Sequence, residues 1–167
     1  GYAILTLVVF RILWGVVGST SARFTDFLYR PGRVIAFAKD LLLRRPANFL
    51  GHNPLGGWMV LLLLLALLFQ AGSGLFANDD ISTEGPLYRY ISNDLSDRLT
   101  GLHKLNTKLL YGLVALHVAA VLYHWFGLGE KLVHAMFTGF KASPPGAQSS
   151  VQLSNLRFSS LWLALGL

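Results

Sequence analysis

Residues 56–77, GGWMVLLLLLALLFQAGSGLFA, form a run of 22 residues without a charged side chain. A helix of about 20 apolar residues is long enough to cross the hydrocarbon core of a bilayer. Similar apolar runs cover residues 1–19 and much of 99–127. The mean hydropathy of the chain is +0.51, and only 13% of its 167 residues are charged. Three such runs in a short chain predict an all-α transmembrane helical bundle rather than a soluble domain.

The loops between the apolar runs differ in charge. Residues 20–55 carry six basic and two acidic side chains, a net of +4, and residues 128–160 carry three basic and one acidic, a net of +2. Residues 78–98 carry two basic and five acidic side chains, a net of −3. Because cytoplasmic loops are rich in Lys and Arg, the sequence predicts a cytoplasmic location for the two basic segments and a periplasmic one for the acidic segment.

The predicted organisation follows from these two patterns. Membrane helices are expected over 1–19, 57–77 and 99–127, with loops over 20–56, 78–98 and 128–156 and the truncated start of a fourth helix over 157–167. Within the first loop, RVIAFAKDLLLRR (33–45) has the spacing of an amphipathic helix, which either lies on the inner membrane surface or packs on the bundle. The chain begins and ends within apolar runs, so we expect a fragment of a longer membrane protein.

Charge and cysteine content exclude several classes. Of the net charge of +6, the loops that orient the protein in the membrane carry +3, and Arg11, Lys104 and Lys108 in the apolar runs carry the rest, so nucleic-acid binding is not needed to explain it. The chain has no cysteine, which excludes disulfides and thiolate-bound metal centres within it.

Three histidines, His103, His117 and His124, interrupt the apolar run of 99–127 at gaps of 14 and 7 residues. Since a helical residue turns about 100° and rises about 1.5 Å, His103 and His117 share one face about 21 Å apart. His124 lies on the same face, about 10 Å further along the axis. Ionisable side chains within membrane helices are costly and mark ion, proton or cofactor paths.

Two imidazoles at this spacing suit two haems, each taking one axial ligand from this helix and one from a neighbour. The competing use is a proton relay. Such a relay normally recruits carboxylates, and the runs 1–19, 57–77 and 99–127 contain none.

The segment LHKLNTKLLYGLVALHVAAVLYHWF (102–126) resembles the fourth membrane helix of bacterial cytochrome b561 proteins, which are related to the cytochrome b subunit of nickel–iron hydrogenases. Other segments fit the same family in the same order: FRILWGVVGS (10–19), GHNPLGGWM (51–59), GLFANDDISTEGPL (74–87) and LVHAMFTGFK (132–141). The resemblance covers nearly all of residues 1–141.

This resemblance implies a four-helix core with two b-type haems, in which His103 and His117 each supply one axial ligand to an iron. The partner ligands in that family lie on the first helix and at the outer end of the second. Aligned with it, the chain begins just after the second helix's ligand and lacks the first helix. As it stands it would complete neither site, so a haem-free fragment is an alternative outcome.

Three further polar residues and one short stretch are candidates near such a site. The resemblance suggests that His124 is not a ligand; geometry allows ligation, and an interfacial hydrogen bond is the alternative. His52 either touches the edge of the inner haem or caps the loop. Arg11 lies deep in the first run, where a haem propionate or a backbone carbonyl could pair with it. The stretch 70–74 either lines a haem pocket or packs helices.

The sequence therefore predicts a membrane b-type cytochrome in a bacterial inner membrane, carrying electrons between two haems as a respiratory or redox-chain component. Quinone, a periplasmic cytochrome c and hydrogenase subunits are the candidate electron partners that the resemblance implies. Whether it is itself an enzyme, such as a quinol oxidase, stays open. The alternative is a non-haem transporter or anchoring subunit that uses the histidines for proton transfer or helix packing.

Overall fold

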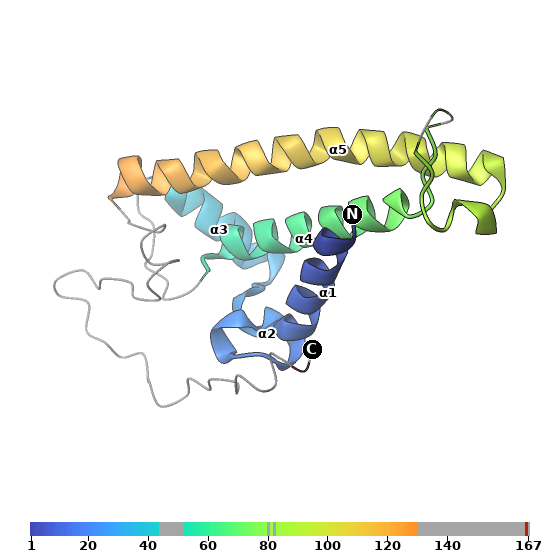
Figure 1. The fold of residues 1–167 in the computed structure, drawn as a ribbon. Coiled ribbons are helices and arrows are strands. Elements are labelled where there is room, and N and C mark those ends of the chain that lie inside the picture. Colours follow the sequence, from blue (N-terminus) through green and yellow to red (C-terminus); the bar gives the residue numbers. More distant parts are fainter. Residues whose placement is uncertain (44–51, 80, 82, 130–165, 167) are drawn as a thin grey trace.

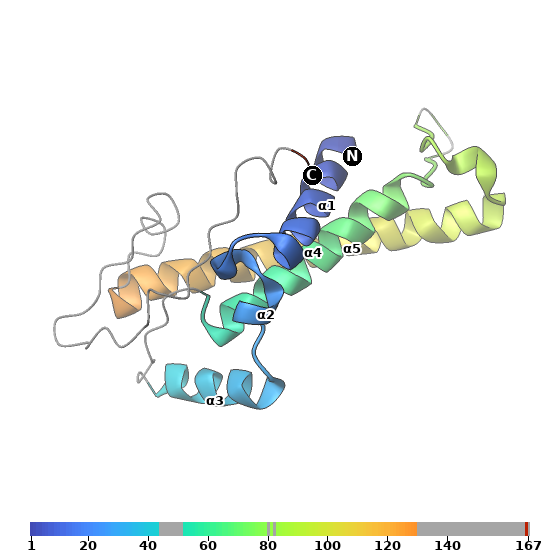
Figure 2. The ribbon, with the colours of Figure 1, turned by 90° about the horizontal axis from the view of Figure 1, so that it is seen from below.

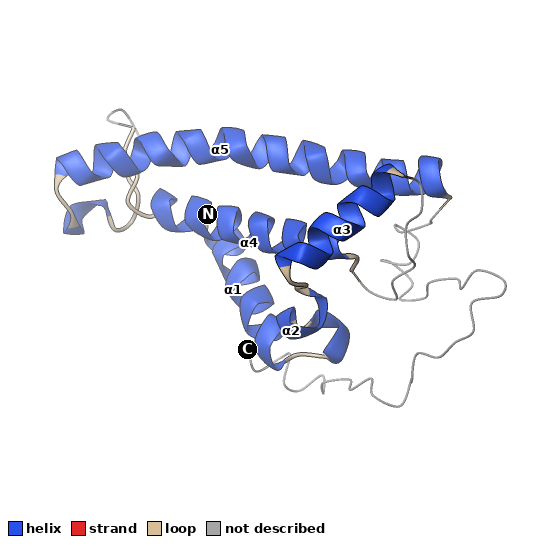
Figure 3. Cartoon of the chain, turned by 180° about the vertical axis from the view of Figure 1, so that it is seen from behind, coloured by secondary structure: helices blue, strands red, loops and turns tan. Residues whose placement is uncertain are grey.

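The computed structural model describes residues 1–43, 52–79, 81, 83–129 and 166 (Figure 1). These residues form helices joined by turns and loops, with one isolated antiparallel bridge between Asn78 and Glu84. Figure 3 shows the described chain as helix and loop throughout. The all-helical fold class is therefore confirmed. The helix expected over 157–167, and the segment 128–156 beyond Gly129, lie outside the described residues.

Two antiparallel helices, α4 (Pro54–Gly74) and α5 (Asn93–Leu122), lie side by side and form the long axis of the molecule (Figures 1 and 2). A π-helical turn (Tyr123–Gly127) continues α5. Both are long and apolar enough to cross a membrane. Their apolar side chains stay largely outside the protein, with Leu105 61% and Leu116 58% exposed. A soluble protein would bury such residues, so these surfaces are suited to lipid.

Polar caps begin both helices earlier than the apolar pattern indicated. The Asn53 side chain accepts a hydrogen bond from the Gly56 amide at 2.7 Å, and α4 starts at Pro54 rather than at 57. The Ser92 hydroxyl accepts from the Leu95 amide at 3.4 Å, and α5 starts at Asn93 rather than at 99. Asp94 therefore lies in the first turn of a helix, where a carboxylate complements the helix dipole, and not in the loop.

The N-terminal helix α1 (Tyr2–Val17) is shorter than the first predicted span. Its 16 residues reach about 24 Å, less than the roughly 30 Å of a bilayer core. It packs against α4 and crosses it steeply in Figures 1 and 2 instead of running alongside it.

Three short helices connect α1 to α4: a 3-10 turn (Thr20–Ala22), α2 (Phe24–Phe27) and α3 (Pro31–Leu42). The amphipathic helix expected within 33–45 is thus present as α3, and it packs against α4. Phe37 is its buried side chain, whereas Ile35 and Leu42 remain 57% and 84% exposed. The helix therefore combines a face packed on the protein with apolar side chains free to meet lipid.

The connection from α4 to α5 is pinned onto the first turns of α5. The buried Ser96 hydroxyl donates to the Phe76 carbonyl at 2.8 Å, and the Asn78 amide donates to the Thr100 hydroxyl at 3.0 Å. The segment contains a 3-10 turn (Tyr88–Tyr90). These bonds hold the start of the connection, residues 76–78, against the first turns of α5, which extend past the end of α4.

Candidate functional site

Side-chain contacts between α4 and α5 fix where His103 and His124 lie along α4. Ser73, near the C-terminal end of α4, lies against His103, and Asn53, which caps the N-terminal end, lies against His124. The two histidines are thus held at opposite ends of a 21-residue helix of spanning length. His117 lies between them on α5 and is half-buried.

The imidazole of His103 packs into a notch on α4. Its Nε2 lies 2.8 Å from the side-chain nitrogen of Gln70, and its Nδ1 lies 3.1 Å from the Ser73 hydroxyl. Gly74 forms the floor of the notch, because a Cβ there would lie 3.1 Å from the ring carbon Cε1. Both ring nitrogens therefore face polar groups of α4, and the stretch 70–74 packs directly on the predicted ligand.

Two further polar residues of α5 join this cluster. Asn106 is 8% exposed and donates to the Gln70 side-chain oxygen at 2.7 Å and to the Ala66 carbonyl at 2.9 Å. The Thr107 hydroxyl accepts from the Gln70 side-chain nitrogen at 2.9 Å and donates to the His103 carbonyl at 3.0 Å. Neither residue was singled out from the sequence. Their spacing of three and four from His103 puts them on its helical face, which is the signal that could have found them.

The second half of the site gathers around His52. Its ring lies 4.9 Å from the Phe27 ring between centroids. Partial burial lowers the pKa of His52, and the nearby charges of Arg11 and His117 lower it further. His52, Arg11 and His117 come from three separate segments, and the structure brings them into one electrostatic neighbourhood.

Arg11 is held by the segment that follows α1. Its guanidinium donates to the Ala22 carbonyl at 3.2 Å and lies over the Phe24 and Phe27 rings at 5.5 and 5.8 Å. Of the two partners expected for this charge, the structure shows the backbone carbonyl. The space beside Gly15 is filled by the Phe24 ring, since a Cβ there would lie 2.2 Å from Phe24 Cε2.

His124 is 6% exposed and lies in the π-helical turn that follows α5. Its Nε2 is 3.5 Å from the side-chain nitrogen of Asn53, the residue that caps α4. This geometry matches the interfacial hydrogen bond considered for His124, and it joins the last turn of one helix to the first turn of the other.

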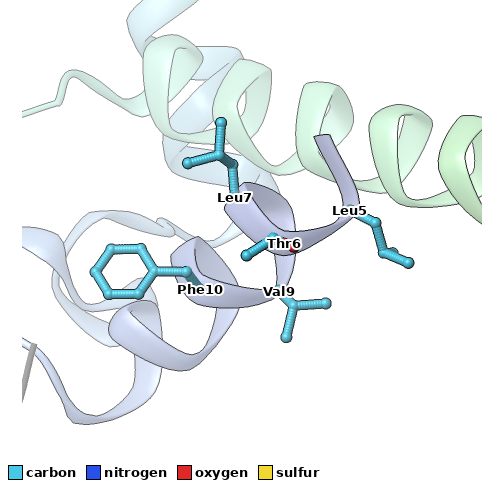
Figure 4. A pocket seen from close by; sticks show the side chains of 5 residues that line it. All are labelled: Leu5, Thr6, Leu7, Val9 and Phe10. Atoms are coloured by element: carbon cyan, nitrogen blue, oxygen red, sulfur yellow. The ribbon is translucent and has the colours of Figure 1, made fainter. Parts of the chain in front are cut away.

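A shallow apolar pocket of about 390 Å³ lies elsewhere, on α1. A single stretch of helix lines it, as Figure 4 shows for Leu5, Thr6, Leu7, Val9 and Phe10. None of these side chains belongs to the histidine clusters, so the pocket is not part of the candidate site.

Long helices with exposed apolar surfaces, holding histidines between them near both ends, define an integral membrane protein with candidate cofactor ligands. The model of the family described as prokaryotic cytochrome b561 matches residues 1–139, and the chain belongs to that family. It is therefore a membrane b-type cytochrome for electron transfer, with haem as its implied cofactor. Neither the curated proteins nor the solved structures contain a significant match.

Proposed function

We propose that the full-length protein holds two b-type haems, with His103 and His117 each as an axial ligand of one iron, and passes electrons between them across the bilayer. The observation that carries this proposal is the pair of histidines 14 residues apart on α5, a helix long and apolar enough to span a membrane, with His103 against α4 and His117 half-buried. Helical geometry separates the two residues by about 21 Å along the axis.

The residues present fit a haem ligand at His103. Its ring sits in a notch floored by Gly74, with the Ser73 hydroxyl on Nδ1, which leaves Nε2 as the ligating nitrogen once the Gln70 side chain turns away. A second polar group on the other imidazole nitrogen is the usual outer partner of a metal-bound histidine. Haem, when bound, supplies one-electron chemistry. The chain supplies ligands, a fixed separation and an apolar surround.

The second half of the site, His52 with Arg11 and His117, is proposed for a similar use. The charges of Arg11 and His117 both act on His52, and Arg11 is the cation proposed to pair with a propionate of a haem held by His117. The ring of His52 would then border that haem rather than ligate its iron, and His124 would remain with Asn53.

The spectrum of the full-length protein tests the proposed function. Purified from membranes, the protein is expected to show a reduced-minus-oxidised b-type spectrum, with two haems per chain by haem extraction. The competing use of the histidines for helix packing is favoured by the contacts of His103 and His124 with α4. A correctly inserted but colourless full-length protein would establish that alternative and exclude the haem proposal.

We also infer a bacterial inner-membrane location with residues 78–98 in the periplasm and residues 20–56 in the cytoplasm, from their opposite net charges. The electron partners would then be quinone in the bilayer, a periplasmic cytochrome c or hydrogenase subunits.

Single cysteines test the sidedness, because the chain has none of its own. In intact spheroplasts, Tyr90→Cys, at a position 81% exposed, is expected to react with a membrane-impermeant maleimide. The matched variant Lys39→Cys, on α3, is expected to react only after the membrane is opened. The reverse labelling pattern would invert the orientation.

A further inference from the structure

The polar cluster around His103 determines which nitrogen of that imidazole carries the proton. A neutral imidazole has one N–H donor and one bare acceptor nitrogen, and neighbouring hydrogen bonds select between the two tautomers. The side-chain amides of Gln70 and Asn106 could in principle each be turned over, which would exchange donors and acceptors. Backbone carbonyls can only accept hydrogen bonds, so their contacts with these side chains determine how each amide is oriented.

The first such group is the Ala66 carbonyl, a backbone acceptor. It lies 2.9 Å from the Asn106 amide group, so Asn106 must present its nitrogen there. The second N–H of Asn106 then points to Gln70 at 2.7 Å, and Gln70 must present its oxygen to receive it. The Gln70 nitrogen is consequently turned toward His103.

The second anchor is the His103 carbonyl, again a backbone acceptor. The Thr107 hydroxyl donates its only hydrogen to this carbonyl at 3.0 Å. Its oxygen can therefore only accept from Gln70, whose nitrogen lies 2.9 Å away. This path also requires the nitrogen of Gln70 on the side of His103, independently of Asn106.

Both anchors lead to the same tautomer. One N–H of Gln70 serves Thr107, and the other points at His103 Nε2, 2.8 Å away, so Nε2 must be the bare nitrogen. The proton then resides on Nδ1 and is donated to the Ser73 hydroxyl at 3.1 Å. The Ser73 hydroxyl in turn donates its own hydrogen to the backbone carbonyl of Gln70 at 3.3 Å, which is a third anchor and agrees with the other two.

We propose that Ser73, Gln70, Asn106 and Thr107 are positioning residues that hold His103 with the proton on Nδ1 and the lone pair on Nε2, the tautomer needed to bind a metal through Nε2. The link to haem rests on the proposed function; the tautomer itself does not. A metal on Nε2 would replace the N–H of Gln70 there, so the Gln70 side chain would turn away from His103, while the Ser73 hydroxyl would go on accepting the hydrogen bond from Nδ1. That remaining bond strengthens the imidazole as a donor and favours oxidised iron.

The redox potentials of the haem-loaded, full-length protein test the role of Ser73. Ser73→Ala is expected to raise the midpoint potential of one haem, the one lost in His103→Ala, and to leave the other unchanged. Ser73→Thr, which keeps the hydroxyl, is expected to restore the wild-type value. The matched control is Ser92→Ala, because the Ser92 hydroxyl also bonds a backbone group, the Leu95 amide, but lies 11 residues before His103 on the chain. Unchanged potentials in Ser73→Ala with both haems retained would overturn the proposal.

The two anchors are tested by the tautomer of His103 in the full-length protein grown without haem. The double variant Asn106→Leu/Thr107→Val removes both supports of the Gln70 amide. Gln70 can then turn its oxygen toward Nε2, so the variant is expected to show His103 as a mixture of both tautomers by nitrogen-15 NMR. A proton on Nδ1 alone in this variant would contradict the proposed anchoring.

Nitrogen-15 NMR of histidine-labelled, full-length protein grown without haem separates failure of this proposal from failure of the proposed function. The His103 signals, assigned by their absence in His103→Gln, are expected to show a protonated Nδ1 and a bare Nε2. If the wild-type protein is colourless but shows this tautomer, the haem proposal is wrong and the proposed hydrogen-bond network is still supported. A proton on Nε2 would overturn the network itself.

Discussion

His103→Ala is expected to remove one of two haems from the full-length protein and to leave the other in place. Alanine has no nitrogen to offer the iron, so one axial bond is lost outright, while His117 lies 14 residues away along α5 and keeps its own surroundings. His117→Ala is expected to remove the other haem. Haem content per chain and redox titration, which resolves the surviving haem by its potential, measure both outcomes.

His124→Ala is the matched control for these variants, since His124 is on the same helix but lies against the Asn53 cap. It is expected to keep both haems. Added imidazole is expected to restore the lost haem in His103→Ala by filling the vacated ligand position. Two haems per chain in both His103→Ala and His117→Ala would show that the ligands lie elsewhere.

Gly57→Ala is expected to cause the largest loss of stability among small substitutions in α4. A Cβ at this position would lie 2.3 Å from the Phe27 carbonyl oxygen, and a backbone atom cannot swing aside as a side chain does. The segment that leads from α2 would have to move away from α4. Overpacking of this kind costs about 1–3 kcal/mol, and each kcal/mol lowers Tm by about 2–4 °C in a chain of this size.

Gly72→Ala tests whether this effect comes from the clash. Gly72 lies in the same helix, and a Cβ there would meet no atom within 4 Å. Alanine favours helix over glycine by about 0.5–1 kcal/mol, so Gly72→Ala is expected to leave Tm unchanged or raise it. The measurement is thermal unfolding in detergent, followed by circular dichroism. Equal Tm values for the two variants would mean that α4 does not pack on Phe27 as described.

The apolar runs predicted the existence of the helices but not their ends. The structure shows α4 and α5 beginning earlier because Asn53 and Ser92 satisfy the first free amides, and polar caps leave no mark in a hydropathy pattern. The run 1–19 was expected to span the membrane. Its helix, α1, has 16 residues and ends at Val17, because Gly18 and Ser19 break from helical geometry before the 3-10 turn.

The sequence predicted the candidate ligands, but it did not predict which residues hydrogen-bond to His103. Helical spacing alone puts His103 and His117 on one face. The stretch 70–74 was open to two interpretations, pocket lining or helix packing, and the structure shows Gln70 and Ser73 in direct contact with His103. For Arg11 the charge predicted a partner, and only the fold showed that the Ala22 carbonyl fills that role here.

Periodicity, hydropathy and loop charge are properties of the linear chain. They determined that this protein is an all-helical membrane protein and that three histidines share a face of one helix. The prokaryotic cytochrome b561 family was indicated instead by the resemblance of segments such as 102–126, and the family model shows it. The tertiary structure decided which polar groups meet across α4 and α5. Those contacts depend on the register of the two helices, because a shift of a single turn, about 5.4 Å, would separate Ser73 and Gln70 from His103 and remove both partners of its imidazole.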